Sequence, residues 1–255
     1  MLGEGNVSEN LVMLNATDGC RIFGTLTQGN LPRALVIFVH GLTGDRDYHL
    51  YHRAARTFPA LGFDTFRYDL FSNAPGGRTL TDCSLSIFAA DLSLVLQHFS
   101  SYYKQIHVIG HSIGGAIAML TDQSHIASLV LWDTGLNRDP KARTPFEFSE
   151  QLGLYVARLK IEYLLSPELI RERSELDERL LARLQSPVKL IFASNTKIRQ
   201  SWQDLLDKLP VPHEAETIEG AGHGFSEWGV DERLFELTLS WINRQTETRA
   251  EEGTR

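Results

Sequence analysis

Residues 106–120 read IHVIGHSIGGAIAML, an apolar run, then Gly110-His111-Ser112-Ile113-Gly114, then a run of small apolar residues. The first run is typical of a buried strand and the last of a helix, which places Ser112 at a strand-to-helix turn. A serine on such a tight turn needs glycine two residues to either side, because a Cβ there would collide with the neighbouring strand or helix. The pattern predicts a nucleophilic Ser112, although a lone G-x-S-x-G match also occurs in ordinary glycine-rich loops.

Two further stretches flank this turn along the chain. Residues 38–44 read FVHGLTG and residues 220–225 read GAGHGF. In this order the three stretches resemble the α/β-hydrolase superfamily, and the resemblance extends from about Leu11 to Asn243. It implies an α/β-hydrolase fold, in which a mostly parallel eight-stranded sheet is flanked by helices and carries a helical cap insertion.

Length and charge agree with a single enzyme domain. The chain has 255 residues and a net charge of −7, and it lacks the clusters of Lys and Arg that a nucleic-acid surface needs. Cys20 and Cys83 follow no metal or disulfide spacing, which favours free thiols in a reducing compartment. The sequence has neither an apolar run long enough to cross a membrane nor a signal-peptide pattern at residues 1–10. We therefore expect a cytoplasmic protein with no membrane partner.

Strand-like and helix-like segments alternate along the chain, as in a parallel sheet covered on both faces. A D-G turn at residues 18 and 19 separates two segments that predict an edge hairpin. The predicted strands are 11–15, 20–27, 34–39, 63–68, 106–109, 127–132, 188–193 and 215–218, and the predicted helices are 48–61, 82–99, 115–120, 199–209 and 231–243.

The segment between these elements predicts a cap. Residues 1–134 and 187–244 form the expected core, residues 135–186 the cap, and residues 245–255 a charged tail without apolar anchors. Residues 167–184 place leucines on one face of a predicted helix. The cap aromatics have two open interpretations: Phe146, Phe148 and Tyr155 line an acyl pocket, or they only pack the cap onto the core.

The proposed nucleophile needs a base, because a serine hydroxyl is a poor nucleophile near neutral pH. His223 is the best candidate among nine histidines, since the small residues of its Gly-Ala-Gly-His-Gly loop would let the imidazole reach Ser112. His40 and His111 flank backbone features and are expected to be structural. Neither an H-E-x-x-H nor a C-x-x-C pattern occurs, so we expect neither a metal nor another cofactor.

The oxyanion hole follows from the resemblance. In the family, one backbone N–H comes from the residue after the nucleophile and another from the loop after the third strand. These positions correspond to Ile113 and Leu42 in this chain.

The third member of the triad departs from the usual pattern. Most of the family places an Asp a few residues past the next-to-last strand, but residues 193–197 here read ASNTK. A variant of the family places the acid after the preceding strand, where this chain has Asp133. We predict Asp133 as the acid that orients His223. The alternatives are Asn195 as a neutral orienter, an acid from the cap, or no third member.

These observations predict a serine hydrolase that cleaves an ester or thioester of a small-to-medium acyl group through an acyl-enzyme intermediate. The only expected partner is this small-molecule substrate, and the oligomeric state stays open. C–C bond hydrolases, peroxidases and peptidases share the scaffold and are alternatives. The missing acid in the 193–197 loop leaves a further alternative, a catalytically silent ligand-binding protein.

Overall fold

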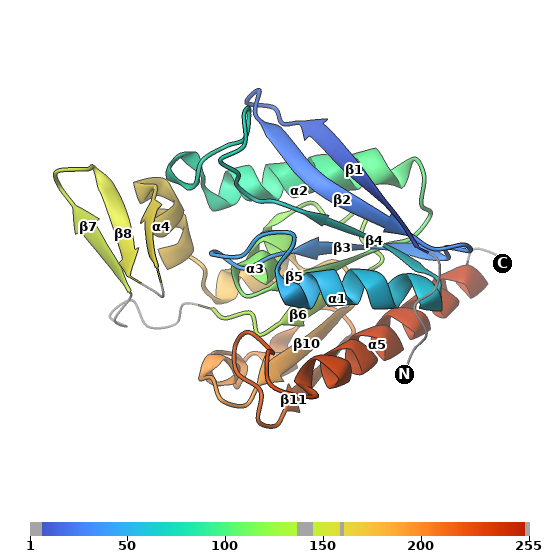
Figure 1. Ribbon diagram of the computed structural model, residues 1–255. Helices are drawn as coiled ribbons and strands as arrows, with labels where there is room; N and C mark the ends of the chain where they lie inside the picture. The colour runs from blue at the N-terminus through green and yellow to red at the C-terminus, as the bar shows by residue number, and fades with distance from the viewer. Residues whose placement is uncertain (1–6, 137–144, 159–160, 253–255) are drawn as a thin grey trace.

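The computed structural model describes residues 7–136, 145–158 and 161–252. Within these ranges the chain builds an eight-stranded sheet with the order β1-β2-β4-β3-β5-β6-β10-β11 (Figure 1). β2 pairs antiparallel with β1 and β4, and the other neighbours are parallel. The strands are β1 (Ser8–Asn15), β2 (Arg21–Gln28), β3 (Ala34–Val39), β4 (Phe63–Tyr68), β5 (Ile106–His111), β6 (Ser128–Trp132), β10 (Val188–Ala193) and β11 (His213–Ile218).

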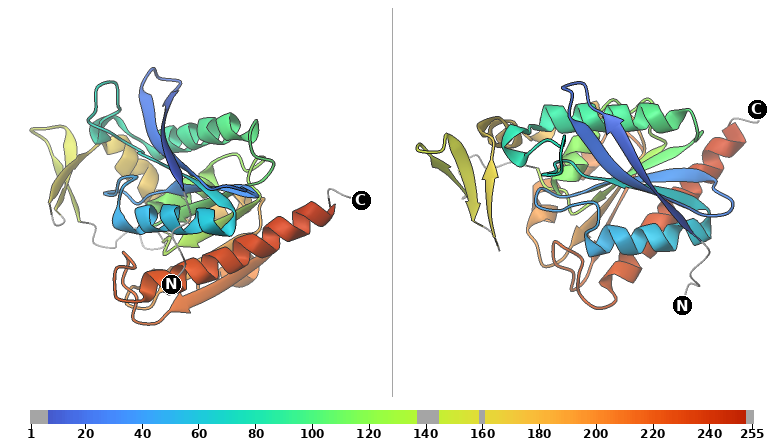
Figure 2. Two further views of the ribbon diagram at one scale, coloured as in Figure 1. Left: turned by 45° about the vertical axis from the view of Figure 1, so that its right-hand side comes forward. Right: turned by 45° about the horizontal axis from the view of Figure 1, so that its top comes forward.

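Helices cover both faces of this sheet (Figure 2). α2 (Leu85–Ser100) and α3 (Ile113–Leu120) lie on one face, and α1 (His49–Thr57) and α5 (Val230–Glu252) lie on the other. β3 is buried along its whole length. Its odd-numbered side chains join the hydrophobic cluster of the α2 and α3 face, and its even-numbered side chains join that of the α1 and α5 face. Burial on both faces explains why this strand is apolar throughout.

The edge hairpin forms as the D-G turn predicts. β1 and β2 pair in continuous register from Ser8 opposite Gln28 to Asn15 opposite Arg21. Gly19 in the connecting turn has φ +85°, a left-handed conformation that glycine adopts without a steric penalty.

The cap differs from the helical insertion that the sequence predicted. Its first part is a separate antiparallel sheet of β7 (Phe146–Ser149), β8 (Leu154–Arg158) and β9 (Glu162–Leu165), which projects from one end of the molecule (Figure 1). Apolar and polar residues alternate in β7, which is the period of a strand rather than of a helix. Gly153, with φ +65°, lies in the turn that leads into β8. Residues 137–144 and 159–160 of the predicted cap lie outside the described residues.

Two predicted helices are also shorter than expected. The segment 167–184 divides into α4 (Pro167–Ser174) and the 3-10 turn η3 (Glu178–Arg183), because the Asp177 side chain accepts from the Arg179 amide and starts a new turn. The segment 199–209 forms two 3-10 turns, η4 (Ile198–Trp202) and η5 (Leu206–Lys208). In η4 the Ser201 hydroxyl donates to the Ile198 carbonyl, a local bond that competes with a regular helix.

The last helix extends past the expected end of the fold. α5 continues to Glu252, whereas a tail was predicted from residue 245. The extension is held by Thr246, which is buried and whose hydroxyl lies 3.0 Å from His107 Nε2. This contact with β5 is a long-range anchor that the charged local sequence does not reveal. Residues 253–255 lie outside the described part of the chain.

None of the helices in the described ranges is both long and apolar enough to cross a membrane.

His107 provides a test of this packing. Its imidazole is fully buried and contacts hydroxyls on both sides, Ser128 Oγ at 2.8 Å and Thr246 Oγ1 at 3.0 Å. Burial lowers the pKa of His107 from 6.5 to about 3. Between these two values the unfolded chain binds the proton and the folded chain does not. Protonation therefore favours unfolding, and stability falls as the pH drops through this window.

We predict that His107→Gln weakens this pH dependence, because its amide meets the same hydroxyls but does not titrate. The wild-type free energy of unfolding, measured with urea at pH 7, 6 and 5, should fall more steeply than that of the variant. Below pH 6, the free energy of unfolding should fall by about 1.4 kcal/mol more per pH unit in the wild type than in His107→Gln. Equal slopes in the two proteins would contradict this account of His107.

Candidate active site

Ser112 lies on the predicted strand-to-helix turn, between the end of β5 and the first residue of α3. Its backbone has φ 56° and ψ −123°, a strained conformation for a residue with a side chain. The surrounding glycines are required sterically. A Cβ on Gly114 would lie 2.1 Å from the Val39 carbonyl oxygen, and a Cβ on Gly110 would lie 2.4 Å from Gly115 Cα. The turn thus holds the Ser112 side chain at the carboxyl end of the parallel strands.

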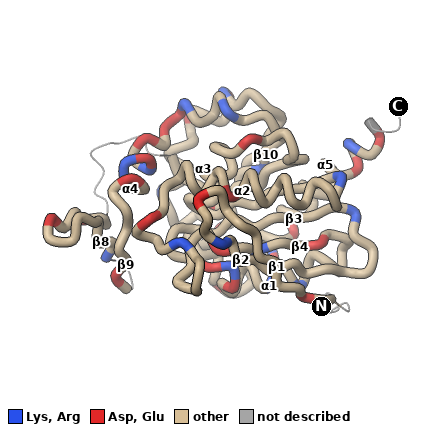
Figure 3. Tube along the Cα trace, turned by 90° about the horizontal axis from the view of Figure 1, so that it is seen from above, with Lys and Arg blue, Asp and Glu red and all other residues tan. Residues whose placement is uncertain are grey.

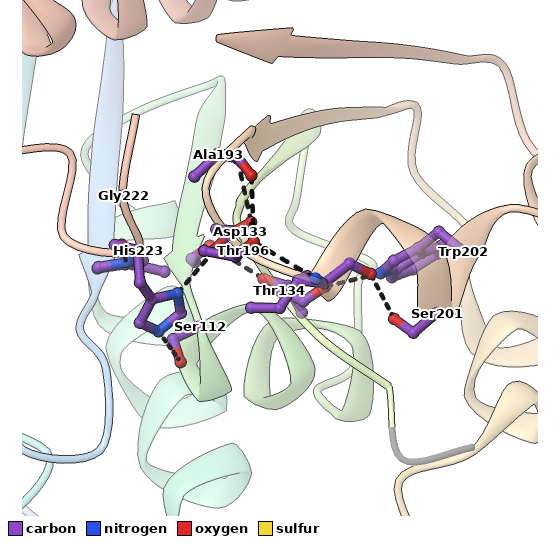
Figure 4. Close-up of polar contacts among 12 residues, drawn as sticks. Ser112, Asp133, Thr134, Ala193, Thr196, Ser201, Trp202, Gly222 and His223 are labelled. Atoms are coloured by element: carbon purple, nitrogen blue, oxygen red, sulfur yellow. Dashed lines mark hydrogen bonds and ion pairs between the residues drawn. The ribbon is translucent and has the colours of Figure 1, made fainter. Parts of the chain in front are cut away.

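His223 follows β11 and reaches this serine. Its Nε2 lies 3.0 Å from Ser112 Oγ, and its Nδ1 lies 2.7 Å from Asp133 Oδ2 (Figure 4). A neutral imidazole that donates its Nδ1 proton to a carboxylate has an unprotonated Nε2. The Ser112 hydroxyl therefore donates to Nε2, which is the geometry a general base requires.

Asp133 comes directly after β6, at the position favoured from the sequence. Its backbone has φ 43° and the residue is fully buried. The two carboxylate oxygens have different partners. Oδ2 accepts from His223, while Oδ1 accepts from the Ala193 amide at 3.1 Å and the Thr196 hydroxyl at 3.2 Å. A buried carboxylate needs such donors, and here they come from β10 and the loop after it.

The other candidates for the third position point elsewhere. The exposed Asn195 side chain donates to the Gly220 carbonyl at 2.9 Å, so it holds the loop that follows β11 rather than the imidazole. Among the described residues, the hydrogen-bond partners of the His223 ring are Asp133 and Ser112. The carboxylates in the described part of the cap therefore make no hydrogen bond with the His223 ring.

Sequence reasoning missed two residues that support Asp133. Thr196 donates to its carboxylate, and Trp202 Nε1 donates to the carbonyl of the next residue, Thr134, at 2.6 Å (Figure 4). Both come from the segment after β10: Thr196 lies in the 193–197 loop that lacks an acid, and Trp202 is the last residue of η4. A hydroxyl and an indole carry no local sequence signal for this role, since the contacts span more than 60 residues.

The predicted oxyanion residues flank the nucleophile. Ile113 is the first residue of α3, where the backbone N–H has no intrahelical partner and the helix dipole favours negative charge. Leu42 follows Gly41 in the loop after β3. A Cβ on Gly41 would lie 3.4 Å from Ser112 Cβ, which shows how closely this loop approaches the serine. The loop is braced by His40, whose Nδ1 donates to the Gly41 carbonyl at 2.7 Å.

His40 also binds a neighbouring loop. Its Nε2 accepts from the Leu70 amide at 3.0 Å, and burial lowers the pKa of His40 to about 4. The ring is therefore neutral at neutral pH and acts as a fixed brace, as the sequence suggested. Within the described residues, no group of three or more His, Cys, Asp or Glu side chains is arranged to hold a metal ion.

The cap aromatics occupy two different environments. Phe146 and Tyr155 are half-buried and pack against the large hydrophobic cluster of the α2 and α3 face. Phe148 is exposed, and its ring lies 5.1 Å from that of Tyr155, its partner across the sheet. Arg173 of α4 lies over the Phe146 ring at 4.9 Å. These contacts place Phe146 and Tyr155 against a hydrophobic cluster that also includes cap residues such as Ala157 and Leu165, whereas Phe148 faces solvent.

Comparison with known proteins supports the same architecture. The model of the alpha/beta hydrolase family matches residues 36–234. Human monoglyceride lipase is 29% identical over 157 residues, which are 57% of this chain and 50% of the human protein. The chain thus matches about half the length of this curated relative.

Solved structures share the fold at low sequence identity. Est1E from Butyrivibrio proteoclasticus, bound to ferulic acid, has a TM-score of 0.73 and 18% identity, and covers 92% of this chain and 99% of its own. The monoacylglycerol lipase of Paleococcus ferrophilus has a TM-score of 0.69 and 15% identity, with 88% and 99% covered. With the family model spanning most of its length and the central sheet built as described, the chain belongs to the alpha/beta hydrolase family.

Proposed function

We propose that this protein is a serine hydrolase that cleaves a carboxylic ester or thioester of a small-to-medium acyl group through an acyl-enzyme intermediate. The observation that carries the proposal is the continuous chain of hydrogen bonds from Ser112 Oγ to His223 Nε2 and from His223 Nδ1 to Asp133. Such a chain lets the imidazole take the serine proton while the carboxylate stabilises the resulting imidazolium.

Each residue has a defined step in this reaction. Ser112 Oγ attacks the substrate carbonyl as its proton moves to His223 Nε2, and the Leu42 and Ile113 amides hold the oxyanion. A single oxyanion donor of this kind is typically worth ~3–4 kcal/mol in the transition state. The intermediate collapses as His223 returns the proton to the leaving alcohol or thiol. Water then attacks the acyl-enzyme carbonyl as His223 takes its proton, and His223 returns that proton to Ser112 Oγ as the carboxylic acid leaves.

The relatives favour ester substrates. Human monoglyceride lipase and the monoacylglycerol lipase of Paleococcus ferrophilus are named for glycerol esters, and Est1E was solved with ferulic acid. The proposal places the acyl pocket in the cap, with Phe146, Phe148 and Tyr155 as its candidate aromatic lining. The packing contacts of Phe146 and Tyr155 and the exposure of Phe148 keep the alternative that these rings only pack the cap, and the last test below separates the two roles. The proposal includes a cytoplasmic setting and no nucleic-acid or membrane partner. It rests on the net charge of −7 and on the free Cys20 and Cys83.

The silent binding protein is the alternative from another functional class. Its basis is the missing acid in the 193–197 loop, and the contact of Asp133 with His223 supports the serine hydrolase instead. C–C bond hydrolases and peptidases would use the same three residues on other bonds, so the substrate panel below separates them from esterases.

We predict that the wild-type protein hydrolyses p-nitrophenyl acetate, butyrate and octanoate, and that Ser112→Ala lowers kcat by about 10⁴-fold or more. The thermal stability of the variant should stay near wild type, because Ser112 serves chemistry more than packing. Ser226→Ala is the matched control, since Ser226 is an exposed serine three residues after His223. Wild-type turnover in Ser112→Ala would contradict the mechanism. A folded protein inactive on all three esters would favour one of the alternatives.

The cap proposal has its own test on this panel. Phe146→Ala and Phe148→Ala should change which acyl length is hydrolysed fastest. Their loss of folding free energy should stay below the ~3–5 kcal/mol that truncation of a core aromatic typically causes, because a pocket-lining ring packs against fewer neighbours. Leu152→Ala is the control, since this exposed leucine lies in the turn between β7 and β8. A large loss of stability with unchanged acyl preference would show that these rings only pack the cap.

A further inference from the structure

A hydrogen-bonded path crosses the core behind the catalytic residues. It begins at the Gly41 amide, which donates to Tyr51 Oη at 3.4 Å, and continues from Tyr51 Oη to His111 Nδ1 at 2.7 Å. It ends where His111 Nε2 meets the carbonyl oxygen of His223 at 2.7 Å. The path therefore connects the predicted oxyanion loop, the residue before the nucleophile and the backbone of the proposed base.

The partners determine which ring nitrogen of His111 carries the proton. A carbonyl oxygen only accepts, so His111 Nε2 must be protonated and must donate to His223. In the neutral ring Nδ1 is then an acceptor, and the Tyr51 hydroxyl must donate to it. Burial lowers the pKa of His111 to about 3 and raises that of Tyr51, which keeps both groups neutral.

This contact joins the backbone of His223 itself to the residue before the nucleophile. The His223 side chain is 47% exposed, and the bonds at Gly222 and Phe225 are local ones. Earlier in the loop, the Asn195 amide donates to the Ala221 carbonyl at 2.9 Å and the Gly220 amide donates to Ser194 Oγ at 2.9 Å, so these bonds tie the loop to the segment after β10. His111, in contrast, is the residue before Ser112. Its bond to the His223 carbonyl fixes the base relative to the nucleophile.

Tyr51 is itself held rigidly. Its ring stacks on Trp132 at 6.5 Å with an interplanar angle of 9°, and Trp132 Nε1 donates to Thr238 Oγ1 at 3.0 Å. Trp132 directly precedes Asp133 in the chain. One aromatic block in the core therefore supports both the path to the His223 backbone and the carboxylate that meets its ring.

We propose that Tyr51 and His111 are positioning residues for the reaction. The His223 carbonyl requires the His111 tautomer protonated at Nε2, Tyr51 stabilises this tautomer by donating to Nδ1, and the bond from His111 to His223 holds the imidazole at working distance from Ser112. The inference rests on the proposed serine-hydrolase function. It requires that Tyr51 acts on catalysis only through His111.

A double-mutant cycle tests this dependence. Tyr51→Phe should lower kcat about 5- to 30-fold with KM changed less than about threefold, since one buried hydrogen bond is lost. His111→Leu should lower kcat by about 10²-fold through misplacement of the base. His111→Gln should recover most of the activity, because its amide can both donate to His223 and accept from Tyr51. Adding Tyr51→Phe to His111→Leu should cause no further loss.

Tyr103→Phe is the matched control. This substitution also removes a hydroxyl that donates to a side chain, since Tyr103 Oη donates to Asp64 at 2.6 Å. Tyr103 lies outside the path. We expect its kcat to stay at the wild-type value. Additive losses in the double variant, or an equal fall of kcat in Tyr103→Phe, would overturn the proposal.

A second measurement does not need activity. Nitrogen-15 NMR of the imidazoles should show His111 protonated at Nε2 only in the wild type, and a mixture of tautomers in Tyr51→Phe. A wild-type protein that shows this tautomer but no esterase activity would contradict the proposed function, while the hydrogen bond from His111 to the His223 carbonyl would still stand. The opposite tautomer in the wild type would overturn the role of Tyr51 and His111 whatever the activity.

Discussion

The site depends on one buried carboxylate. Asp133 has no exposed surface, and an isolated charge in such a place would be costly, so its oxygens must be matched by donors. One oxygen takes two donors from β10 and the loop after it, and the other takes the imidazole of His223. The carboxylate thus joins three segments that are far apart in the sequence. Through His223 it reaches the serine, which stands on a fourth.

Seen from above, the trace of α4 and the last turns of α5 carry both acidic and basic residues, whereas β3 at the centre of the sheet carries neither (Figure 3). This arrangement explains which parts could be predicted. The strands 34–39, 63–68 and 188–193 have the bounds expected from sequence. Burial on both faces makes the first a continuous apolar run, whereas the other two also bury polar side chains such as Arg67 and Lys189. The strand-to-helix turn at Ser112 was predictable for a steric reason, since Gly110 and Gly114 fill places where a Cβ would collide with backbone.

The rest of the site depends on contacts that local sequence does not encode. The cap was expected to be helical from the family resemblance and from the leucines on one face of residues 167–184, whereas the alternation of Phe146, Glu147 and Phe148 that makes a strand spans only a few residues. Asp133 was predicted as the acid, with Asn195 as a neutral orienter, an acid from the cap or no third member as alternatives. Sequence could not separate Asp133 from Asn195 by position, since both follow strands whose carboxyl ends meet at the same edge of the sheet. Only the fold shows that Asn195 turns to Gly220. The Tyr51 and His111 contacts likewise join residues 60 positions apart.

Replacing the carboxylate by its amide tests the central claim most directly. In Asp133→Asn the amide oxygen can still accept from Ala193 and Thr196, while the amide nitrogen would face His223 and favour the wrong imidazole tautomer. The account predicts a folded variant whose kcat for p-nitrophenyl esters falls by about 10²- to 10⁴-fold. Asn195→Ala should keep nearly all of its activity. A folded Asp133→Asn with wild-type kcat, or an Asn195→Ala that loses as much, would contradict the assignment of Asp133.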